Sequence, residues 1–372
     1  MQVPFYTPVR EYRIRKEAFD RALMATIERG DFILGHDVAA FETDAASWLG
    51  VKYAVGVASG TDALVLGADI LGFKNGVEVV TPTYTFFASA SCLVRNGARP
   101  VFVDMDEETL NMNLAEAERK ITKNTKGILP VHLFLQPTPL AEVMHLARDH
   151  NLKVLEDAAE GWGMETYING EWKKAGTVGD IGIYSFFPTK TLGAFGDAGL
   201  MVTNDETLHE LIRAYRVHGS KERYNHEYVG YNSRLDTLQA SILRVKLAKT
   251  DEAIAARARH AQHYTERLSR VPGLRIPSVR SDAHPVYYVY NILVLRRDEL
   301  AAFLKEQGIG TSIYYPKPLH LQKCFSYLGY KQGDFPVAER VSKEIIALPM
   351  FPELTDDEVD YVCDKIEAFY ER

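Results

Sequence analysis

The sequence predicts an α/β protein: a large domain with a mainly parallel sheet, followed by a smaller α/β C-terminal domain. Through the first two-thirds of its 372 residues, short apolar segments alternate with segments of helical spacing. The strand-like segments are continuously apolar, which is typical of parallel strands that helices cover on both faces. A chain of this length can bury a sizeable core and form two domains.

Each predicted strand is a short apolar segment. These segments are YAVGVASG, VEVVTP, PVFVDMD, KGILPVHLF, KVLEDAA and IGIYSF. Helical spacing of apolar residues is found between them, in TDALVLGADILG, TFFASASCLVRNG and LAEVMHLARDHN. Ligands of a parallel sheet bind beyond the carboxyl ends of its strands. The candidate site residues are therefore the polar residues at these ends: Ser59, Thr61, Thr83, Tyr84, His132, Asp157 and Ser185.

A change of pattern marks the predicted domain boundary. Residues 236–270 show a long helical spacing, and VPGLRIP, VYYVYNILVL and further helical segments follow it. We therefore assign residues 1–249 to the large domain and residues 250–372 to the smaller one.

Composition and charge exclude several classes of protein. The formal net charge is −7 without a basic stripe, so we expect no nucleic-acid partner. The N-terminus lacks the apolar region of a signal peptide and charges interrupt every long apolar stretch, so we expect no membrane partner. Cys92, Cys324 and Cys363 are far apart and lack metal-ligand spacing. They indicate reduced thiols in a cytoplasmic protein without a metal site.

The segment ASGTDAL joins a predicted strand to a predicted helix. Gly60 permits a tight backbone there, and Ser59, Thr61 and the first free N–H groups of the helix can bind an anion. The alternative is an ordinary helix N-cap without a ligand.

Two charged residues follow neighbouring strand-like segments. Asp157 ends KVLED, and its carboxylate can cap a helix, bind a metal or hold a cationic ring nitrogen. Lys190 follows IGIYSF within SFFPTKTLGAFGDAG, where it is either a solvated surface residue or directed at an internal electrophile. A phosphate site, a carboxylate and a lysine are together what pyridoxal 5′-phosphate (PLP) requires. Tyr84 offers a flat face to its ring, or is a core aromatic.

From about residue 4 to residue 370, the sequence resembles the PLP-dependent nucleotide-sugar aminotransferases of the DegT/StrS family. The resemblance is carried by FILG, ASGTDAL, TPTYTF, EDAAE, SFFPTKTLGAFGDAG, GYNSRLDTLQA, YYPKPLH and LPMFPELT, in the family's order. It implies the aspartate-aminotransferase-like fold of the fold type I PLP enzymes. It also implies a homodimer with shared active sites.

The resemblance implies roles for individual residues. Lys190 would bind the cofactor covalently and then carry a proton, and Asp157 would pair with the pyridine nitrogen. Glu160 would lie near the phenolic oxygen, where many relatives have glutamine, and its carboxylate would have to take up a proton or turn away. The other implied cofactor contacts are Gly60, Thr61, Tyr84, Ser185 and, from the partner subunit, Asn232. The implied substrate contacts are Arg234, Tyr314, Tyr315 and His320.

The implied reaction moves the amino group of L-glutamate to a keto group of a nucleotide-linked sugar, in amino-sugar and polysaccharide biosynthesis. The run HGS…RY before GYNSRLD resembles relatives that aminate C3 of sugars linked to uridine or thymidine diphosphate. Amination at C4 and a non-enzymatic PLP-binding regulator are the alternatives. A sugar dehydratase would carry histidine in place of Lys190. We expect burial beside a cationic cofactor to depress the pKa of the free Lys190 amine.

Overall fold

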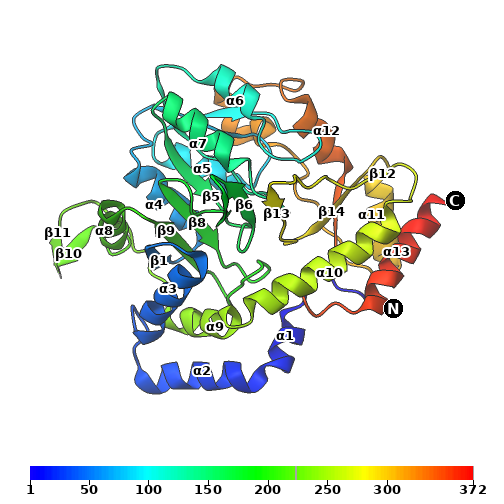
Figure 1. Ribbon diagram of the computed structural model, residues 1–372, viewed down its shortest axis with the longest axis horizontal. Coiled ribbons are helices and arrows are strands. Elements are labelled where there is room, and N and C mark those ends of the chain that lie inside the picture. Colours follow the sequence, from blue (N-terminus) through cyan, green and yellow to red (C-terminus); the bar gives the residue numbers. More distant parts are fainter. Residues whose placement is uncertain (223, 372) are drawn as a thin grey trace.

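A seven-stranded sheet forms the centre of the computed structural model, which describes residues 1–222 and 224–371 (Figure 1). Strand β9 runs antiparallel to both of its neighbours, and the other six strands share one direction. The predicted mainly parallel sheet is thus confirmed. In spatial order the strands are β1 (Tyr53–Val57), β9 (Gly199–Thr203), β8 (Ile181–Ser185), β5 (Lys153–Asp157), β4 (Thr125–Ile128), β2 (Glu78–Pro82) and β3 (Arg99–Val103).

Helices cover both faces of this sheet, which explains why its strands are apolar throughout. Along β5, Leu155 packs into the cluster that includes residues of α4 and α5, whereas Val154 packs into the cluster that includes residues of α6 and α7. Successive residues of one strand therefore enter opposite layers. The helices of this part are α3 (His36–Leu49), α4 (Gly60–Ile70), α5 (Phe87–Arg95), α6 (Leu114–Lys120), α7 (Leu140–Asp149), α8 (Glu206–Tyr215) and α9 (Thr237–Leu247).

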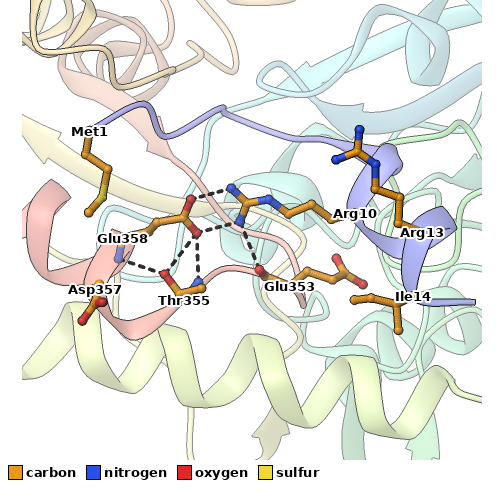
Figure 2. A pocket seen from close by; sticks show the side chains of 8 residues that line it. All are labelled: Met1, Arg10, Arg13, Ile14, Glu353, Thr355, Asp357 and Glu358. Atoms are coloured by element: carbon orange, nitrogen blue, oxygen red, sulfur yellow. Dashed lines mark hydrogen bonds and ion pairs between the residues drawn. The ribbon is translucent and has the colours of Figure 1, made fainter.

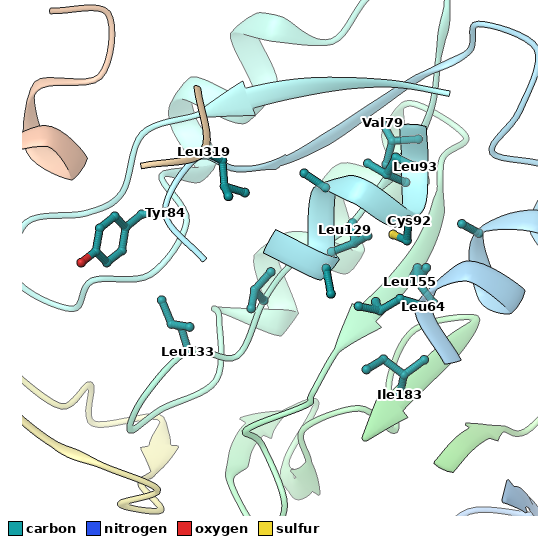
Figure 3. Close-up of a cluster of buried hydrophobic side chains, with 14 of the residues drawn as sticks. Leu64, Val79, Tyr84, Cys92, Leu93, Leu129, Leu133, Leu155, Ile183 and Leu319 are labelled. Carbon is teal, nitrogen blue, oxygen red and sulfur yellow. The ribbon is translucent and has the colours of Figure 1, made fainter. Parts of the chain in front are cut away.

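The layer beneath α4 and α5 is the largest hydrophobic cluster among the described residues. Leu64, Leu155 and Ile183 meet there from a helix and two adjacent strands (Figure 3). Leu319, from the C-terminal part of the chain, belongs to the same cluster and so joins the two parts of the molecule.

The C-terminal part packs around a three-stranded sheet whose central strand, β14, lies within the predicted segment VYYVYNILVL. Long helix α10 (Thr250–Leu268) connects this part to the large sheet (Figure 1). The remaining elements are β12 (Leu274–Arg275), β14 (Tyr290–Val294), α11 (Arg297–Glu306), the 3₁₀ helices η1 (Leu319–Leu321) and η2 (Lys323–Leu328), α12 (Pro336–Glu344), β15 (Ile345–Leu348) and α13 (Asp356–Tyr370).

Two smaller sheets lie outside these layers. One contains β6 (Glu165–Ile168), β7 (Glu171–Lys174) and β13 (Ala283–His284), and the other pairs β10 (Ser220–Glu222) with β11 (Asn225–His226). Residue 223 of the run HGS…RY, on which the C3 prediction rests, lies outside the described residues.

The N-terminal segment packs against the C-terminal part before the chain enters the large sheet. Val3 is fully buried in the C-terminal cluster and bridges to Ile309. The Tyr6 hydroxyl donates a hydrogen bond to the carbonyl of Pro188, two residues before Lys190. Helices α1 (Pro8–Ile14) and α2 (Lys16–Arg29) follow.

An ion pair fixes α1 to the start of α13. The Arg10 guanidinium donates to both carboxylate oxygens of Glu358, at 2.5 and 2.7 Å, and to the carbonyl of Glu353 (Figure 2). Glu358 also forms a capping box with Thr355 at the N-terminus of α13. The division into residues 1–249 and 250–372 stays a prediction. None of the helices in the described ranges combines the length and the apolar character that crossing a membrane requires.

Candidate functional site

A cavity of about 380 Å³ opens at the carboxyl ends of β5 and β8, beside the N-terminus of α4. This is the edge of the sheet where the sequence predicted a site. Nine of the predicted residues line the cavity together: Ser59, Gly60, Thr61, Asp157, Glu160, Ser185, Lys190, Tyr314 and Tyr315.

Lys190 points into this cavity rather than into solvent. Its side chain is only 14% exposed, and its ammonium lies 3.1 Å from a carboxylate oxygen of Glu160. The ammonium also lies over the ring of Tyr288, 4.2 Å from the ring centroid. The alternative of a solvated surface lysine is therefore wrong.

Glu160 stabilises the charged form of Lys190. Burial by itself lowers the pKa of Lys190, but the negative charge of Glu160 and further groups raise it by more, so the pKa lies above its ordinary value. The expected depression concerns the free amine beside a bound cationic cofactor, and it stays a prediction. The expectation considered burial and a cationic neighbour, and it left out a carboxylate in direct contact.

Asp157 is buried at the end of β5, with one carboxylate oxygen accepting from the Ser89 hydroxyl at 2.7 Å. The other oxygen accepts from the backbone N–H of Ala159 at 3.1 Å. Burial is the largest influence on this group and raises the pKa of Asp157. Residues 158–164 form turns, so Asp157 does not cap a helix there. It lines the same cavity as Lys190.

The N-terminus of α4 combines the two alternatives for ASGTDAL. The Ser59 hydroxyl accepts from the backbone N–H of Asp62, which makes it an N-cap, and α4 begins at Gly60 in the cavity wall. A Cβ at Gly60 would lie 2.6 Å from the Cβ of Ser185, so no larger side chain fits. The backbone of Gly60 therefore packs closely against Ser185, and the positive end of the helix dipole lies at the cavity.

These groups fit PLP. An amine, a buried carboxylate and a helix N-terminus with adjacent hydroxyl groups surround one cavity, and they match the aldehyde, the ring nitrogen and the phosphate of that cofactor.

Glu156, next to Asp157, points away from the cavity. Its carboxylate accepts from His132 at 2.9 Å and from the backbone N–H groups of Gly176, Val178 and Gly179. Because the Nδ1 atom of His132 accepts from the N–H of Thr138, Nε2 carries the proton that Glu156 accepts. His132 is therefore a structural residue.

Two predicted contacts lie behind the cavity wall. Tyr84 is 2% exposed, and its hydroxyl donates to the carbonyl and accepts from the N–H of Tyr315, at 2.8 and 2.6 Å. His320 is also 2% exposed and is held between Thr83 and Glu339. Neither side chain lines the cavity, and Tyr84 supports Tyr315, which does.

Asn232 and Arg234 line a second, neighbouring pocket of about 350 Å³. Asp197 lines both pockets, so the second pocket adjoins the first. Asn232 is exposed on this side of the molecule.

The sequence reasoning missed several residues of the cavity. Phe86 lies two positions beyond Tyr84, and its ring is 56% exposed at the cavity. An exposed apolar ring after the end of a strand indicates a residue that faces a ligand. Tyr84 and Phe86 are two positions apart in TPTYTFF, however, so an alternating pattern does not show which of them faces the cavity. Tyr288 enters from the C-terminal part of the chain, and no local pattern connects it to Lys190.

Comparison with known proteins agrees with this fold. The chain matches the DegT/DnrJ/EryC1/StrS aminotransferase family over residues 13–367. It is 44% identical to the pleiotropic regulatory protein of Geobacillus stearothermophilus, over 100% of this chain and 99% of that one. It is 42% identical to the UDP-N-acetyl-3-dehydro-α-D-glucosamine 3-aminotransferase of Acidithiobacillus ferrooxidans, over 91% of this chain and 90% of that one.

Solved structures are similarly close. The X-ray structure of S. venezuelae DesV in complex with a ketimine intermediate has a TM-score of 0.96 at 35% identity, covering 100% of this chain and 99% of that one. The structure of NtdA from Bacillus subtilis with bound cofactor PMP has a TM-score of 0.89 at 27% identity, covering 100% and 86%.

The fold and the cavity define an enzyme of the aminotransferase class. The chain belongs to the DegT/DnrJ/EryC1/StrS aminotransferase family, whose enzymes are PLP-dependent and act on sugar nucleotides. The resemblance inferred from the sequence motifs and the predicted fold class are confirmed.

Proposed function

We propose that the protein uses PLP to move the amino group of L-glutamate to C3 of a 3-keto sugar linked to uridine or thymidine diphosphate. The observation that carries this proposal is the meeting of Lys190, Asp157 and the N-terminus of α4 in one cavity. The identity of glutamate as the donor and a cytoplasmic location are parts of the same proposal and remain to be tested.

The cavity residues divide the chemistry between them. Bound PLP supplies an electron sink for the negative charge that develops when a carbon–hydrogen bond breaks. Asp157 holds a proton on the ring nitrogen, and its raised pKa reflects a buried carboxylate that gains from a cationic partner. Lys190 carries the cofactor and, when freed, takes a proton on Nζ and returns it to the neighbouring carbon. Gly60, Thr61 and Ser185 bind the phosphate.

Relatives support C3 as the site of amination. The Acidithiobacillus relative is a 3-aminotransferase that acts on a UDP-linked sugar. The choice between C3 and C4 depends on which edge of the sugar the cavity turns toward the cofactor. The test is to incubate the protein with PLP, glutamate and matched 3-keto and 4-keto nucleotide sugars, and to locate the new amine by two-dimensional NMR. An amine found only at C4 would overturn this part of the proposal.

We also propose a homodimer with two shared sites, to which Asn232 and Arg234 contribute from the partner subunit. The pocket that they line adjoins the cavity through Asp197 and stands open on one chain. Mixing inactive Lys190→Ala and inactive Asn232→Ala proteins should restore part of the activity, because a hybrid dimer has one intact composite site. Absence of complementation after verified subunit exchange would refute shared sites.

A regulator that binds PLP without catalysis is the second candidate, since the Geobacillus relative is named a pleiotropic regulatory protein. The glutamate half-reaction separates the two candidates. An aminotransferase converts glutamate to 2-oxoglutarate once per site without a sugar acceptor, and a regulator does not. Measuring 2-oxoglutarate against protein concentration decides between them.

A further inference from the structure

Tyr288 contacts Lys190 from the other part of the chain. It precedes β14, is 6% exposed and lines the cavity beside the lysine. Its ring lies beneath the ammonium of Lys190, at 4.2 Å from the centroid, and nearly parallel to the ring of Tyr314 at 6.5 Å. The negative face of an aromatic ring attracts an ammonium ion but has little attraction for a neutral amine.

Glu160 completes the contact from a second direction. Its Oε1 atom accepts from the Lys190 ammonium at 3.1 Å and from the Tyr315 hydroxyl at 3.5 Å. Its Oε2 atom accepts from the backbone N–H of Phe134 at 3.0 Å, which fixes the carboxylate. Asp157 also acts on the charge of Lys190 from β5. The amine is thus held between a carboxylate and a ring.

Tyr288 is itself held at both ends. Its hydroxyl shares a hydrogen bond with the hydroxyl of Thr189 at 3.0 Å. Its carbonyl accepts from Arg257 at 3.1 Å, and the same guanidinium nitrogen also donates to the carbonyls of Tyr287 and Met350. Arg257 belongs to α10 and is 1% exposed, so the backbone behind the ring is anchored to the long helix. The ring therefore presents a fixed face.

We propose that Tyr288 is a positioning residue that, together with Glu160, holds the amine of Lys190 while this amine is protonated and not bonded to the cofactor. The inference rests on the proposed function, in which Lys190 alternates between a bound and a free form. The ring keeps the free ammonium at one place, so that the lysine starts each turnover from the same position. Deprotonation of the amine releases it from both contacts.

The test measures the amine of Lys190 directly, on the protein freed of cofactor. An amine-reactive acylating reagent labels only the neutral amine, so the labelling rate of Lys190, read by mass spectrometry, reports its pKa. Tyr288→Leu removes the ring and should lower the pKa of Lys190, raising its labelling rate at pH 8 about tenfold. Tyr288→Phe keeps the ring face and should stay within about twofold of the parent rate.

Two further variants separate the ring from other effects. Phe86→Leu opens the same cavity without a contact to Lys190 and should also stay within about twofold. Tyr288→Met fills the volume with a flexible chain and replaces Tyr288→Leu if that protein fails to fold. An unchanged labelling rate in the folded Leu or Met variant, or an equal rise in Tyr288→Phe, would overturn the proposal.

The proposed function has a separate readout. Lys190→Ala must lose transamination if Lys190 carries the cofactor, whatever the labelling experiment gives. If Lys190→Ala keeps its activity, the proposed function fails. If the labelling rates alone disagree with expectation, only the role of Tyr288 fails.

Discussion

Two adjacent carboxylates on opposite sides of strand β5 have pKa values that are shifted in opposite directions. Glu156 and Asp157 are both buried, and burial by itself raises the pKa of each. On one side, the hydrogen bonds to Glu156 from His132 and three backbone N–H groups outweigh burial, so the pKa of Glu156 lies below its ordinary value. On the other side, Asp157 accepts two hydrogen bonds and its pKa stays raised.

This difference separates a structural from a functional carboxylate. A group whose acceptor positions are filled by the fold stabilises the fold and has nothing left for a ligand. A group that is buried but incompletely paired costs stability and gains from a cationic ligand. Successive residues of a strand face opposite sides of the sheet. The neighbouring positions 156 and 157 can therefore hold one structural and one functional carboxylate.

The largest expected effect lies on the cavity side. Lys190→Ala should lower transamination about 10³-fold or more, because it removes both the covalent link and the proton carrier. Borohydride reduction in the presence of PLP should fix the cofactor to the peptide that contains Lys190 in the parent protein, and to no peptide in the variant. A variant with near-normal turnover would exclude Lys190 from the reaction.

Asp157→Asn should lower the rate of the glutamate half-reaction about 10²-fold or more, while the melting temperature stays equal or rises. A carboxyl whose pKa is higher in the folded than in the unfolded protein costs stability once the pH exceeds both values, so at pH 7 the amide removes a cost. The amide can still pair with Ser89 and Ala159. A drop in melting temperature would show that Asp157 is structural and would erase the contrast with Glu156.

Glu156→Gln should have the reverse profile. Loss of the charge that pairs with His132 and three N–H groups should cost roughly 3 kcal/mol of unfolding free energy, with turnover per folded molecule within about twofold of the parent. The lowered pKa of Glu156 means that its stabilisation is present above its unfolded pKa and disappears as the pH falls through its folded pKa. Denaturant unfolding at pH 7 and at acid pH measures both effects, and the variant should lose part of the acid dependence.

The smallest expected effects compare the two aromatic residues of TPTYTFF. Tyr84→Phe loses the hydrogen bonds to the backbone of Tyr315 and should cost about 1 kcal/mol of stability, with the affinity for PLP unchanged. Phe86→Leu should weaken PLP binding several-fold and leave stability nearly unchanged, because its ring is largely exposed. PLP titration by absorbance checks both. An unchanged affinity in Phe86→Leu would exclude Phe86 from stacking on the cofactor ring.

Local pattern was sufficient for most of the fold. Continuous apolar runs identified six strands of the large sheet, and their polar ends located Asp157, Ser185 and Gly60 at one edge. The sequence analysis missed strand β9, whose sequence is GLMVT. This short apolar segment directly follows the glycine-rich segment that contains Lys190, so its pattern does not distinguish a strand from a continuation of that loop. Its antiparallel course depends on pairing with β1 and β8, which no local period encodes.

The sequence did not predict two kinds of site contact. The first kind joins residues that are far apart in the chain. The second kind depends on which of two similar side chains faces the cavity. Tyr288 reaches Lys190 because the chain, after α10 has led it into the C-terminal part, returns at β13, which pairs with β6. Tyr84 and Phe86 both follow β2, and the hydrogen bonds to Tyr315 decide that Tyr84 turns inward. Of the substrate contacts that the resemblance implies, Tyr314 and Tyr315 line the cavity and His320 does not, and their contacts to a substrate stay predictions.

The hydrogen bond from Tyr6 to the carbonyl of Pro188 has a practical consequence for handling the protein. Val3 is buried, so the first residues are threaded between the C-terminal cluster and the loop that carries Lys190. We therefore expect a trimmed start at this end to disturb the loop of the reactive amine. The other end of the described chain leaves helix α13 on the outside of the molecule, and a tag is better attached there (Figure 1).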